Sequence, residues 1–383
     1  MSLRTKYFPV NWIDGMKISR QHFAAQDQAM QSMAQDAAVA ALSPVRYGLL
    51  PGYDYQAAVS VDNQGTIRVS VQSCEAVTPA GARISVPGLS FSGQEGGFST
   101  TLPLPAAQGD GGFYVFLVVN PFDTTAGGQP DVAENPPRLP WALPSLSVAL
   151  VPESTVRQGG VAQAYGIPIG RLTGAGASLR AEEEYIPPCL TLSAHPDLAG
   201  LHGELDQFLS RLELNCAQIV QKIYRKSQQN AISELVQFLC DRTILFLAQA
   251  IADMRLRHPH DSPVAMFATM AGLSRVLKNA IDMRIGSGKE ELINYLAEWS
   301  QLSQGELDRM FADMAALPYL HADVNRAIGP VVGFARTVGK LFESLAGLDF
   351  IGKKKESGIF VTEEAAPTQP QPQAEKPKRR FFG

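Results

Sequence analysis

Cysteine is scarce in this sequence, and the few cysteines suggest no familiar site. The four, Cys74, Cys189, Cys216 and Cys240, form no CxxC pair and lie far apart along the chain. This spacing argues against a zinc knuckle and against a compact disulfide framework. Widely spaced free thiols fit a reducing compartment, so we predict a cytoplasmic protein.

Long hydrophobic runs are also absent. A membrane-spanning helix needs about 18 or more predominantly apolar residues in a row, and the sequence offers no such run. The first residues, Met1 to Asp14, include Arg4 and Lys6 but no apolar stretch of the kind found in signal peptides. We therefore predict no signal peptide and no direct membrane insertion.

Most of the chain lacks a net positive charge. The net charge at pH 7 is -4, yet residues 353–383 carry seven Lys or Arg against four Glu, which leaves -7 on residues 1–352. Binding along a nucleic acid needs positive charge clustered on one face. We therefore predict no nucleic-acid partner.

Familiar catalytic motifs are missing too. The sequence contains no Walker loop, dinucleotide fingerprint, GxSxG elbow or HExxH motif. The best metal-like cluster, His258-Pro259-His260-Asp261, spans a proline and has no further ligand nearby, so we interpret it as a turn between helices. Consecutive acidic residues at Glu182-Glu183-Glu184 would point to alternate faces of a strand, which indicates a solvated edge. We predict a protein that is not an enzyme and that holds no metal or cofactor.

What the chain does have is an ordinary globular composition. Its 383 residues are 45% hydrophobic and 18% charged, which predicts two or three domains with a sizeable core. Short alternating runs punctuated by Gly and Pro predict a β-sandwich over residues 1–186. Its strands are expected at residues 57–61, 66–71, 83–86, 114–119, 146–151 and 167–172.

Two parts of this region have patterns of their own. Alternating apolar residues on either side of Asp14-Gly15 predict a hairpin over residues 7–18. The stretch 120–144 holds six prolines and is expected to leave the sheet as a long loop, either a partner contact or a plain surface loop. Ser19 is the expected N-cap of an amphipathic helix with apolar residues at helical spacing: Phe23, Met30, Met33, Ala37 and Ala41.

Residues 187–352 have a helical pattern and predict an α-helical bundle. The run Ile244 to Leu247 is apolar all round, so we expect it to be buried on several sides. Ser303 and Glu306 form a capping box for a later helix. Residues 353–383 form a basic, Pro-rich segment that we expect to be disordered. A helix-packing seam is expected from residues at alternating steps of three and four: Leu198, Leu201, Leu205, Phe208 and Leu212.

The opening stretch from Asn11 to Phe23 contains a W-x-x-G-M element followed by Q-H-F. With two further stretches, it resembles the TssK family of type VI secretion baseplate subunits. Tyr165 to Leu172 resembles a strand before the domain junction, and Tyr185 to Leu190 resembles the junction itself. Weaker landmarks lie at His258-Pro259 and at Tyr319 to Asp323, so the resemblance covers residues 7 to about 350. The motif residues are Trp12, Gly15, Met16, Gln21, His22, Phe23, Pro187 and Pro188.

The resemblance implies a non-catalytic, bacterial baseplate protein. It implies a homotrimer with shoulder-like sandwiches, related to those of tailed-phage receptor-binding proteins, and a helical neck. The sandwiches would dock onto baseplate wedge proteins of the TssF and TssG kind, in the cytoplasm and peripheral to the inner-membrane secretion complex. Family members carry a C-terminal domain that recruits the membrane complex, and we expect this chain to be a divergent form in which residues 353–383 replace it. The tail's final Phe381 and Phe382 would then dock on a partner, or the tail would be a passive end.

Some alternatives stay open at this stage. Trp12 and Met16 are expected to pack into the sandwich core from the predicted hairpin, with a partner contact as the other possibility for Trp12. The two prolines are expected to fix the angle between the domains. A different function, an oligomeric carbohydrate-binding sandwich, would need exposed aromatic residues, for which Trp141, Tyr53 and Tyr55 are the candidates. A hydrolase without a familiar motif is the least favoured class.

Overall fold

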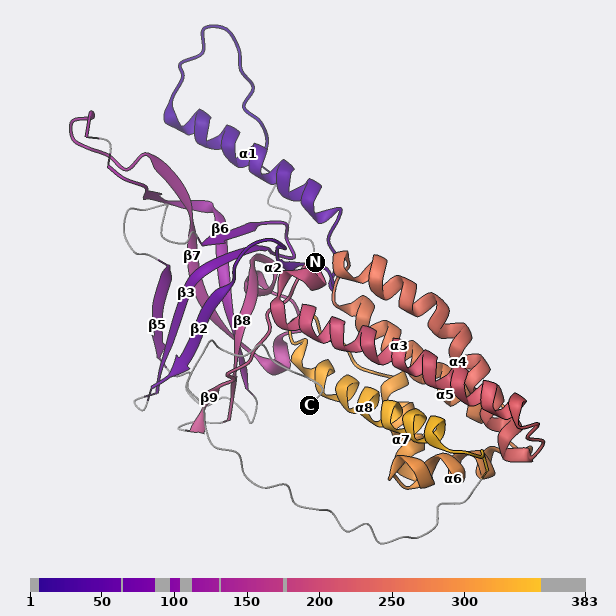
Figure 1. Cartoon of the computed structure of the whole chain (residues 1–383). Helices are drawn as coiled ribbons and strands as arrows, with labels where there is room; N and C mark the ends of the chain where they lie inside the picture. The colour runs from indigo at the N-terminus through magenta and orange to yellow at the C-terminus, as the bar shows by residue number, and fades with distance from the viewer. Residues whose placement is uncertain are drawn as a thin grey trace. The chain divides into compact units, whose positions relative to one another are not determined.

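The computed structural model describes residues 7–62, 65–86, 97–103, 112–130, 132–174 and 178–352. Strands occupy the N-terminal half of the described chain and helices the C-terminal half, as the sequence predicts (Figure 1). The expected tail, with Phe381 and Phe382, lies outside the described residues. The chain forms two compact units. Unit 1 comprises the described residues up to His195 together with Leu320–Asn325, and unit 2 comprises Pro196–Tyr319 and the described residues from Arg326.

The first sheet of unit 1 is built around one long strand. The central strand β3 (Thr66–Val77) pairs antiparallel with β1 (Gly48–Leu49), β2 (Gln56–Val61), β4 (Arg83–Val86) and β5 (Phe98–Pro103). Alternate residues of β3, among them Ile67, Val69 and Val71, are buried, as the period of a strand requires. The predicted strands at 57–61, 66–71 and 83–86 are therefore confirmed.

The second sheet has the order β7-β6-β8-β9 and is antiparallel throughout. Its strands are β6 (Phe113–Gly127), β7 (Trp141–Pro152), β8 (Gly166–Thr173) and β9 (Arg180–Ala181), with a short helix α2 (Val161–Tyr165) before β8. The two sheets touch where Gly170 lies against Val59, because a Cβ at residue 170 would come within 2.8 Å of a Val59 methyl carbon. A side chain larger than that of glycine would force the sheets apart there.

The long loop predicted over residues 120–144 is wrong. After a register shift between Asn120 and Thr124, the ladder resumes and pairs Thr124 to Gly127 with Trp141 to Pro144. The prolines do not prevent this, because Pro144 lies in the edge strand β7, Pro121 lies within the register shift, and the other four lie between the two strands. The segment is thus an extension of the β6–β7 hairpin.

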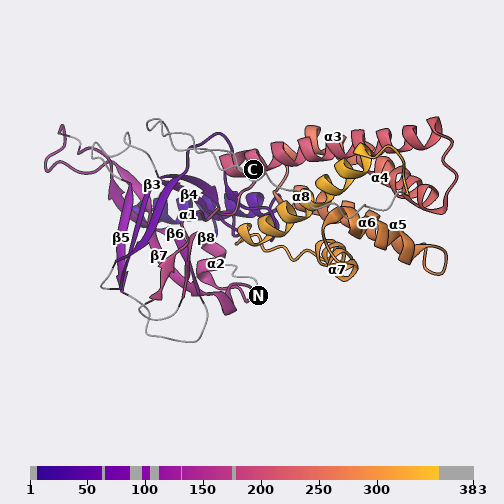
Figure 2. The same ribbon diagram turned by 60° about the horizontal axis from the view of Figure 1, so that its bottom comes forward.

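Unit 2 is helical, and Figure 2 shows its long helices running side by side. They are α3 (Pro196–Arg225), α4 (Ala231–Leu256), α5 (Val264–Asp282), α6 (Lys289–Ser300), α7 (Gln304–Ala315) and α8 (Asn325–Gly347). The predicted capping box of α7 is confirmed, since Ser303 N–H donates to Glu306 Oε2 at 2.8 Å and Glu306 N–H donates to Ser303 Oγ at 3.3 Å. The seam residues from Leu198 to Leu212 are buried within this one chain.

Helix α4 departs from two expectations. Leu247 is buried, but Leu245 is 70% exposed, so the apolar run is covered on one side only. Within the described residues, α4 is also long and apolar enough to cross a membrane by length and composition. The expectation that no such segment exists was therefore too strong. The feature is weak evidence for a span, because the core helix of a globular protein passes the same test and 44% of the qualifying window is buried.

Candidate protein-interaction surface

The opening motif folds as a loop followed by a helix, and the predicted hairpin over residues 7–18 is wrong. None of residues 7–19 is in a strand, and Asp14 and Gly15 form a turn. The loop leads into α1 (Arg20–Val39), whose Gln26 Oε1 accepts a hydrogen bond from Val10 N–H at 3.0 Å. A helix side chain therefore accepts the hydrogen bond of the Val10 N–H, which in a hairpin would donate to a second strand.

Two motif residues have structural roles in this loop. Gly15 has a φ of +79°, in the left-handed region that glycine adopts without strain. The Nδ1 atom of His22 accepts a hydrogen bond from Ser19 N–H at 3.1 Å, so His22 secures the start of α1. Ser19 is the N-cap of this helix, as predicted. Gly15 and His22 thus fix the path along which the loop enters the helix.

The prediction that Trp12 packs into the sandwich core is wrong. Trp12 is 45% exposed, and its ring lies 6.1 Å from the His22 ring and 6.0 Å from the Phe23 ring, centroid to centroid. Phe23 is itself 56% exposed. Met16 is half-buried and Gln21 is exposed. The motif therefore presents an aromatic cluster at the surface of unit 1.

Helix α1 turns its large apolar side chains outward. Ala29 and Gln35 are its buried residues, and the backbone of Gln35 lies so close to Gly81 that a Cβ on that glycine would come within 2.7 Å of the Gln35 carbonyl oxygen. The absence of a side chain at Gly81 thus lets the helix lie close to this turn, whereas Phe23, Met30 and Met33 of the helix are exposed. Figure 1 shows α1 lying outside the sheet strands of this unit. The motif surface comprises the exposed apolar residues of this region: Phe8, Trp12, Ile13, Ile18, Phe23, Met30, Met33 and Val39.

The charge of this region is nearly balanced, with two basic and three acidic residues between residues 8 and 39. Contiguous exposed apolar patches on a folded protein mark interaction sites, whereas single exposed apolar residues are ordinary. The motif surface is of the first kind at Trp12 and Phe23, whose ring centroids lie 6.0 Å apart. What the arrangement can do is bind a complementary apolar surface of another protein.

The junction prolines are part of the core of unit 1. Pro187 and Pro188 are buried, and Leu49 N–H donates to the Pro188 carbonyl at 2.8 Å. Gly48, at a φ of +111°, comes so close that a Cβ would lie 1.9 Å from the Pro188 oxygen. Only glycine fits there, so Gly48 and Pro188 are matched. That the two prolines also set an angle between domains stays a prediction.

A short segment from the helical half of the sequence, Leu320–Asn325, belongs to unit 1. The Tyr114 hydroxyl donates to Asp323 Oδ2 at 2.7 Å, and both side chains are fully buried. The Tyr185 hydroxyl donates to the main-chain carbonyl of Ala322. From the sequence this stretch is only a weak family landmark within the predicted helical bundle. His321 and Asp323, which stand among apolar neighbours in the sequence, were the available signal that this stretch has a special role.

The candidates for a sugar site come from different elements of unit 1 and differ in exposure. Trp141 is 57% exposed and begins β7 of the four-stranded sheet, whereas Tyr53, 53% exposed, precedes β2 of the five-stranded sheet. Tyr55 is half-buried, with its hydroxyl directed to the Ile169 carbonyl at 3.5 Å. The two exposed rings thus belong to different sheets.

The histidine cluster also has a packing role. His258 is 2% exposed, and its ring nitrogens face Met254 Sδ at 3.0 Å and Thr269 Oγ1 at 3.4 Å. Burial lowers the pKa of His258, which favours the neutral ring. Across the described ranges, no group of three or more His, Cys, Asp or Glu is arranged to hold a metal ion.

Comparison with known proteins identifies a family. The family model T6SS_VasE, described as "Bacterial Type VI secretion, VC_A0110, EvfL, ImpJ, VasE", matches residues 22–278, about two thirds of the chain. No curated protein matches the chain. Among solved structures, "Crystal structure of TssK" matches at 16% identity with a TM-score of 0.46, over 87% of this chain and 69% of that chain. A chain of "The baseplate complex from the type VI secretion system" matches with the same identity and TM-score over 87% of this chain and 99% of its own length.

A third solved structure, a TssK-TssF-TssG baseplate subcomplex of the type VI secretion system, contains a chain that matches at 15% identity with a TM-score of 0.42. That match covers 88% of this chain and 99% of the other. The family assignment rests on the family model, which spans more than half of the sequence.

Proposed function

Because this chain belongs to the bacterial type VI secretion family that the matching model describes, we propose that it is a TssK-like baseplate subunit that works by binding partners and not by catalysis. In this proposal a β-sandwich over residues 1–186 and a helical bundle over residues 187–352 form a cytoplasmic homotrimer, peripheral to the inner-membrane complex. The motif surface docks onto a wedge protein of the TssF or TssG kind.

The observation that carries the proposal is the outward-facing apolar side of the opening motif. Trp12 and Phe23 expose 45% and 56% of their surface although both belong to the motif that defines the resemblance. Aromatic residues at the centre of an interface often contribute a large share of the binding free energy. An exposed aromatic pair at the point where a loop enters a helix, with the helix start secured by His22, suits such a role.

The double variant Trp12→Ala, Phe23→Ala is expected to lose wedge binding while remaining folded. Truncating two interface anchors should raise the Kd for the wedge protein by at least about 30-fold, which corresponds to about 2 kcal/mol. Because both side chains are half-exposed, the free energy of unfolding should fall by about 1 kcal/mol or less. Titration of the purified wedge protein and a urea melt give the two values.

The control for this experiment is Val132→Ser, which removes an apolar side chain that is 89% exposed and belongs to the connection between β6 and β7, not to the motif. It should bind the wedge protein as the parent does. Unchanged binding by the double variant would refute the docking role of the motif surface. A large loss of stability would mean instead that the two rings belong to a packed core.

The C-terminal segment is proposed to recruit a further partner of the machine. Its sequence ends with Lys378-Arg379-Arg380 followed by Phe381 and Phe382, a basic patch joined to two aromatic anchors. A chain ending at Gly352 and a Phe381→Ala, Phe382→Ala variant should keep the parent's oligomeric state and melting temperature and lose secretion activity. Normal secretion by both would make the segment a passive end, and loss of assembly by the shortened chain would place the domain boundary elsewhere.

A further inference from the structure

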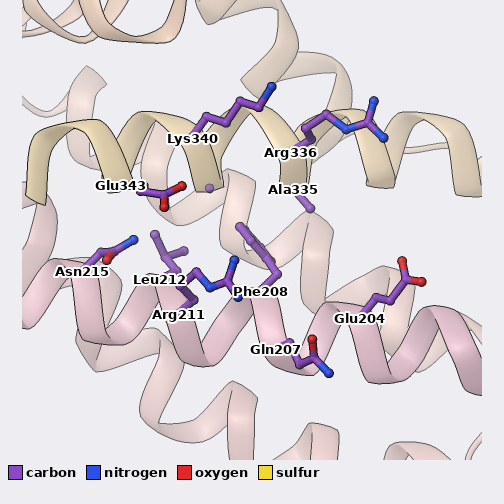
Figure 3. Close-up of a pocket in the computed structure, with 11 residues that line it drawn as sticks. Glu204, Gln207, Phe208, Arg211, Leu212, Asn215, Ala335, Arg336, Lys340 and Glu343 are labelled. Atoms are coloured by element: carbon purple, nitrogen blue, oxygen red, sulfur yellow. The ribbon is translucent and has the colours of Figure 1, made fainter. Parts of the chain in front are cut away.

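A groove runs between α3 and α8 of unit 2. Its volume is about 520 Å³, and Phe208 and Leu212 project from α3 toward α8 across its floor (Figure 3). One end is tied by Lys222, whose Nζ donates to the carbonyl of Ala346 at 2.5 Å near the end of α8. Ala335 lines the α8 side. The groove therefore has an apolar floor between two helices that are joined by a hydrogen bond.

Asn215 is the polar exception in this floor. It continues the seam of α3, because residues 198, 201, 205, 208, 212, 215 and 219 follow one another at alternating steps of three and four and all are buried. Asn215 is 8% exposed, and its Nδ2 atom has no hydrogen-bond partner among the residues that the structure describes. A buried amide donor without a partner costs about 1 to 3 kcal/mol. The groove is therefore incomplete without an acceptor from outside.

The rim of the groove carries both signs of charge. Arg211, Arg336 and Lys340 stand with Glu204 and Glu343 around the opening. A site for an acidic or a basic partner would carry mainly one sign. A surface that carries both can be complementary to a copy of itself, because each copy presents cations and anions to the other.

An exposed apolar residue lies next to the groove on the same helix. Leu214 precedes Asn215 in α3 and is 56% exposed. A ridge and a groove that lie side by side on one molecule can join head to tail, and such contacts close into a ring when the rotation between copies allows it. Leu214 of one copy and the groove of the next are of this kind.

We propose that the α3–α8 groove receives α3 of a second copy of this chain, with Leu214 of that copy on the floor and an acceptor from it meeting Asn215. The inference rests on the homotrimer of the proposed function and adds which surfaces join the copies. Phe208 and Leu212 are the seam residues that reach the groove, whereas Leu198, Leu201 and Leu205 are fully buried within each chain and do not join the copies.

The test is a cross-link between two single-cysteine variants that are produced together. A chain with Leu214→Cys and a chain with Lys340→Cys, carrying tags of different size, should form a mixed disulfide on mild oxidation. The four native cysteines are buried and leave a low background. The control replaces Leu214→Cys with Leu256→Cys, on α4 and 76% exposed, which should give no mixed product.

Light scattering distinguishes failure of the groove contact from failure of the proposed trimer. A mass of about 124 kDa, three chains of 41.3 kDa, together with the mixed disulfide is the expected result. The same mass without the disulfide would overturn the groove as the contact and leave the trimer standing. A mass of one chain for the parent protein would refute the trimer of the proposed function.

A second variant tests whether the groove binds a second copy of this chain. Leu214→Asp should weaken self-association at least tenfold, with unchanged helical content by circular dichroism, because the new carboxylate would have to enter an apolar floor. If Leu214→Asp instead keeps its mass and loses binding to the wedge protein, the groove takes a different partner and the proposal is wrong.

Discussion

Replacing Asp323 by alanine is expected to lower the free energy of unfolding by about 3 to 5 kcal/mol. Asp323 is fully buried, accepts the Tyr114 hydroxyl at 2.7 Å and lies 3.8 Å from a guanidinium nitrogen of Arg171. The same guanidinium contacts Glu153 at 3.0 Å and Glu182 at 3.6 Å. Removing one member of a buried network costs more than the interaction itself, because the remaining groups are left desolvated.

A urea melt of the full chain measures this loss, and two further variants show its origin. Tyr114→Phe removes only the hydroxyl, so the double variant with Asp323→Ala should cost less than the sum of the two single changes. Glu182→Gln, at the partly exposed side of the cluster, should cost about 1 kcal/mol or less. If the urea midpoint of unfolding is the same for Asp323→Ala as for the parent, the segment Leu320–Asn325 does not stabilise unit 1.

The strands of unit 1 were largely predictable, because a half-buried strand shows its period directly. The runs at 66–71 and 167–172 alternate apolar and small or polar residues, and both lie within observed strands. Strand β5 was missed because Phe98–Pro103 has apolar residues only near its ends and is half-buried at best. Its position comes from the pairing with β3, which no local pattern records.

The site was predictable in its residues but not in its orientation. Sequence analysis selected Trp12 and Phe23 and recognised the apolar stripe of α1, yet a stripe does not say whether it faces the core or a partner. The outcome depended on the face of α1 that buries Ala29 and Gln35, because the Gln35 backbone fits close against Gly81. The contact of Tyr114 with Asp323 joins residues 209 positions apart, so neither helical nor strand periodicity could reveal it.

Lowering the pH from 7 to 4 is expected to destabilise the protein by about 3 kcal/mol through His321 alone. Burial lowers the pKa of His321 from 6.5 to about 4, and the hydrogen bond from its Nε2 to the Tyr47 carbonyl, at 2.9 Å, opposes that shift only in part. Between pH 6.5 and 4 the unfolded chain therefore binds a proton that the folded chain does not. Stability must fall as the pH drops through this window and level off below it.

The variant His321→Gln isolates this contribution, because glutamine keeps an N–H donor for the Tyr47 carbonyl and does not titrate. Its stability should be lower at pH 7 through imperfect packing, but the decline between pH 6.5 and 4 should be shallower than the parent's by about one proton. The matched control is His260→Gln, an exposed histidine whose replacement should leave the parent's slope intact. An unchanged slope in His321→Gln would mean that this ring is already protonated, or accessible to solvent, in the folded protein.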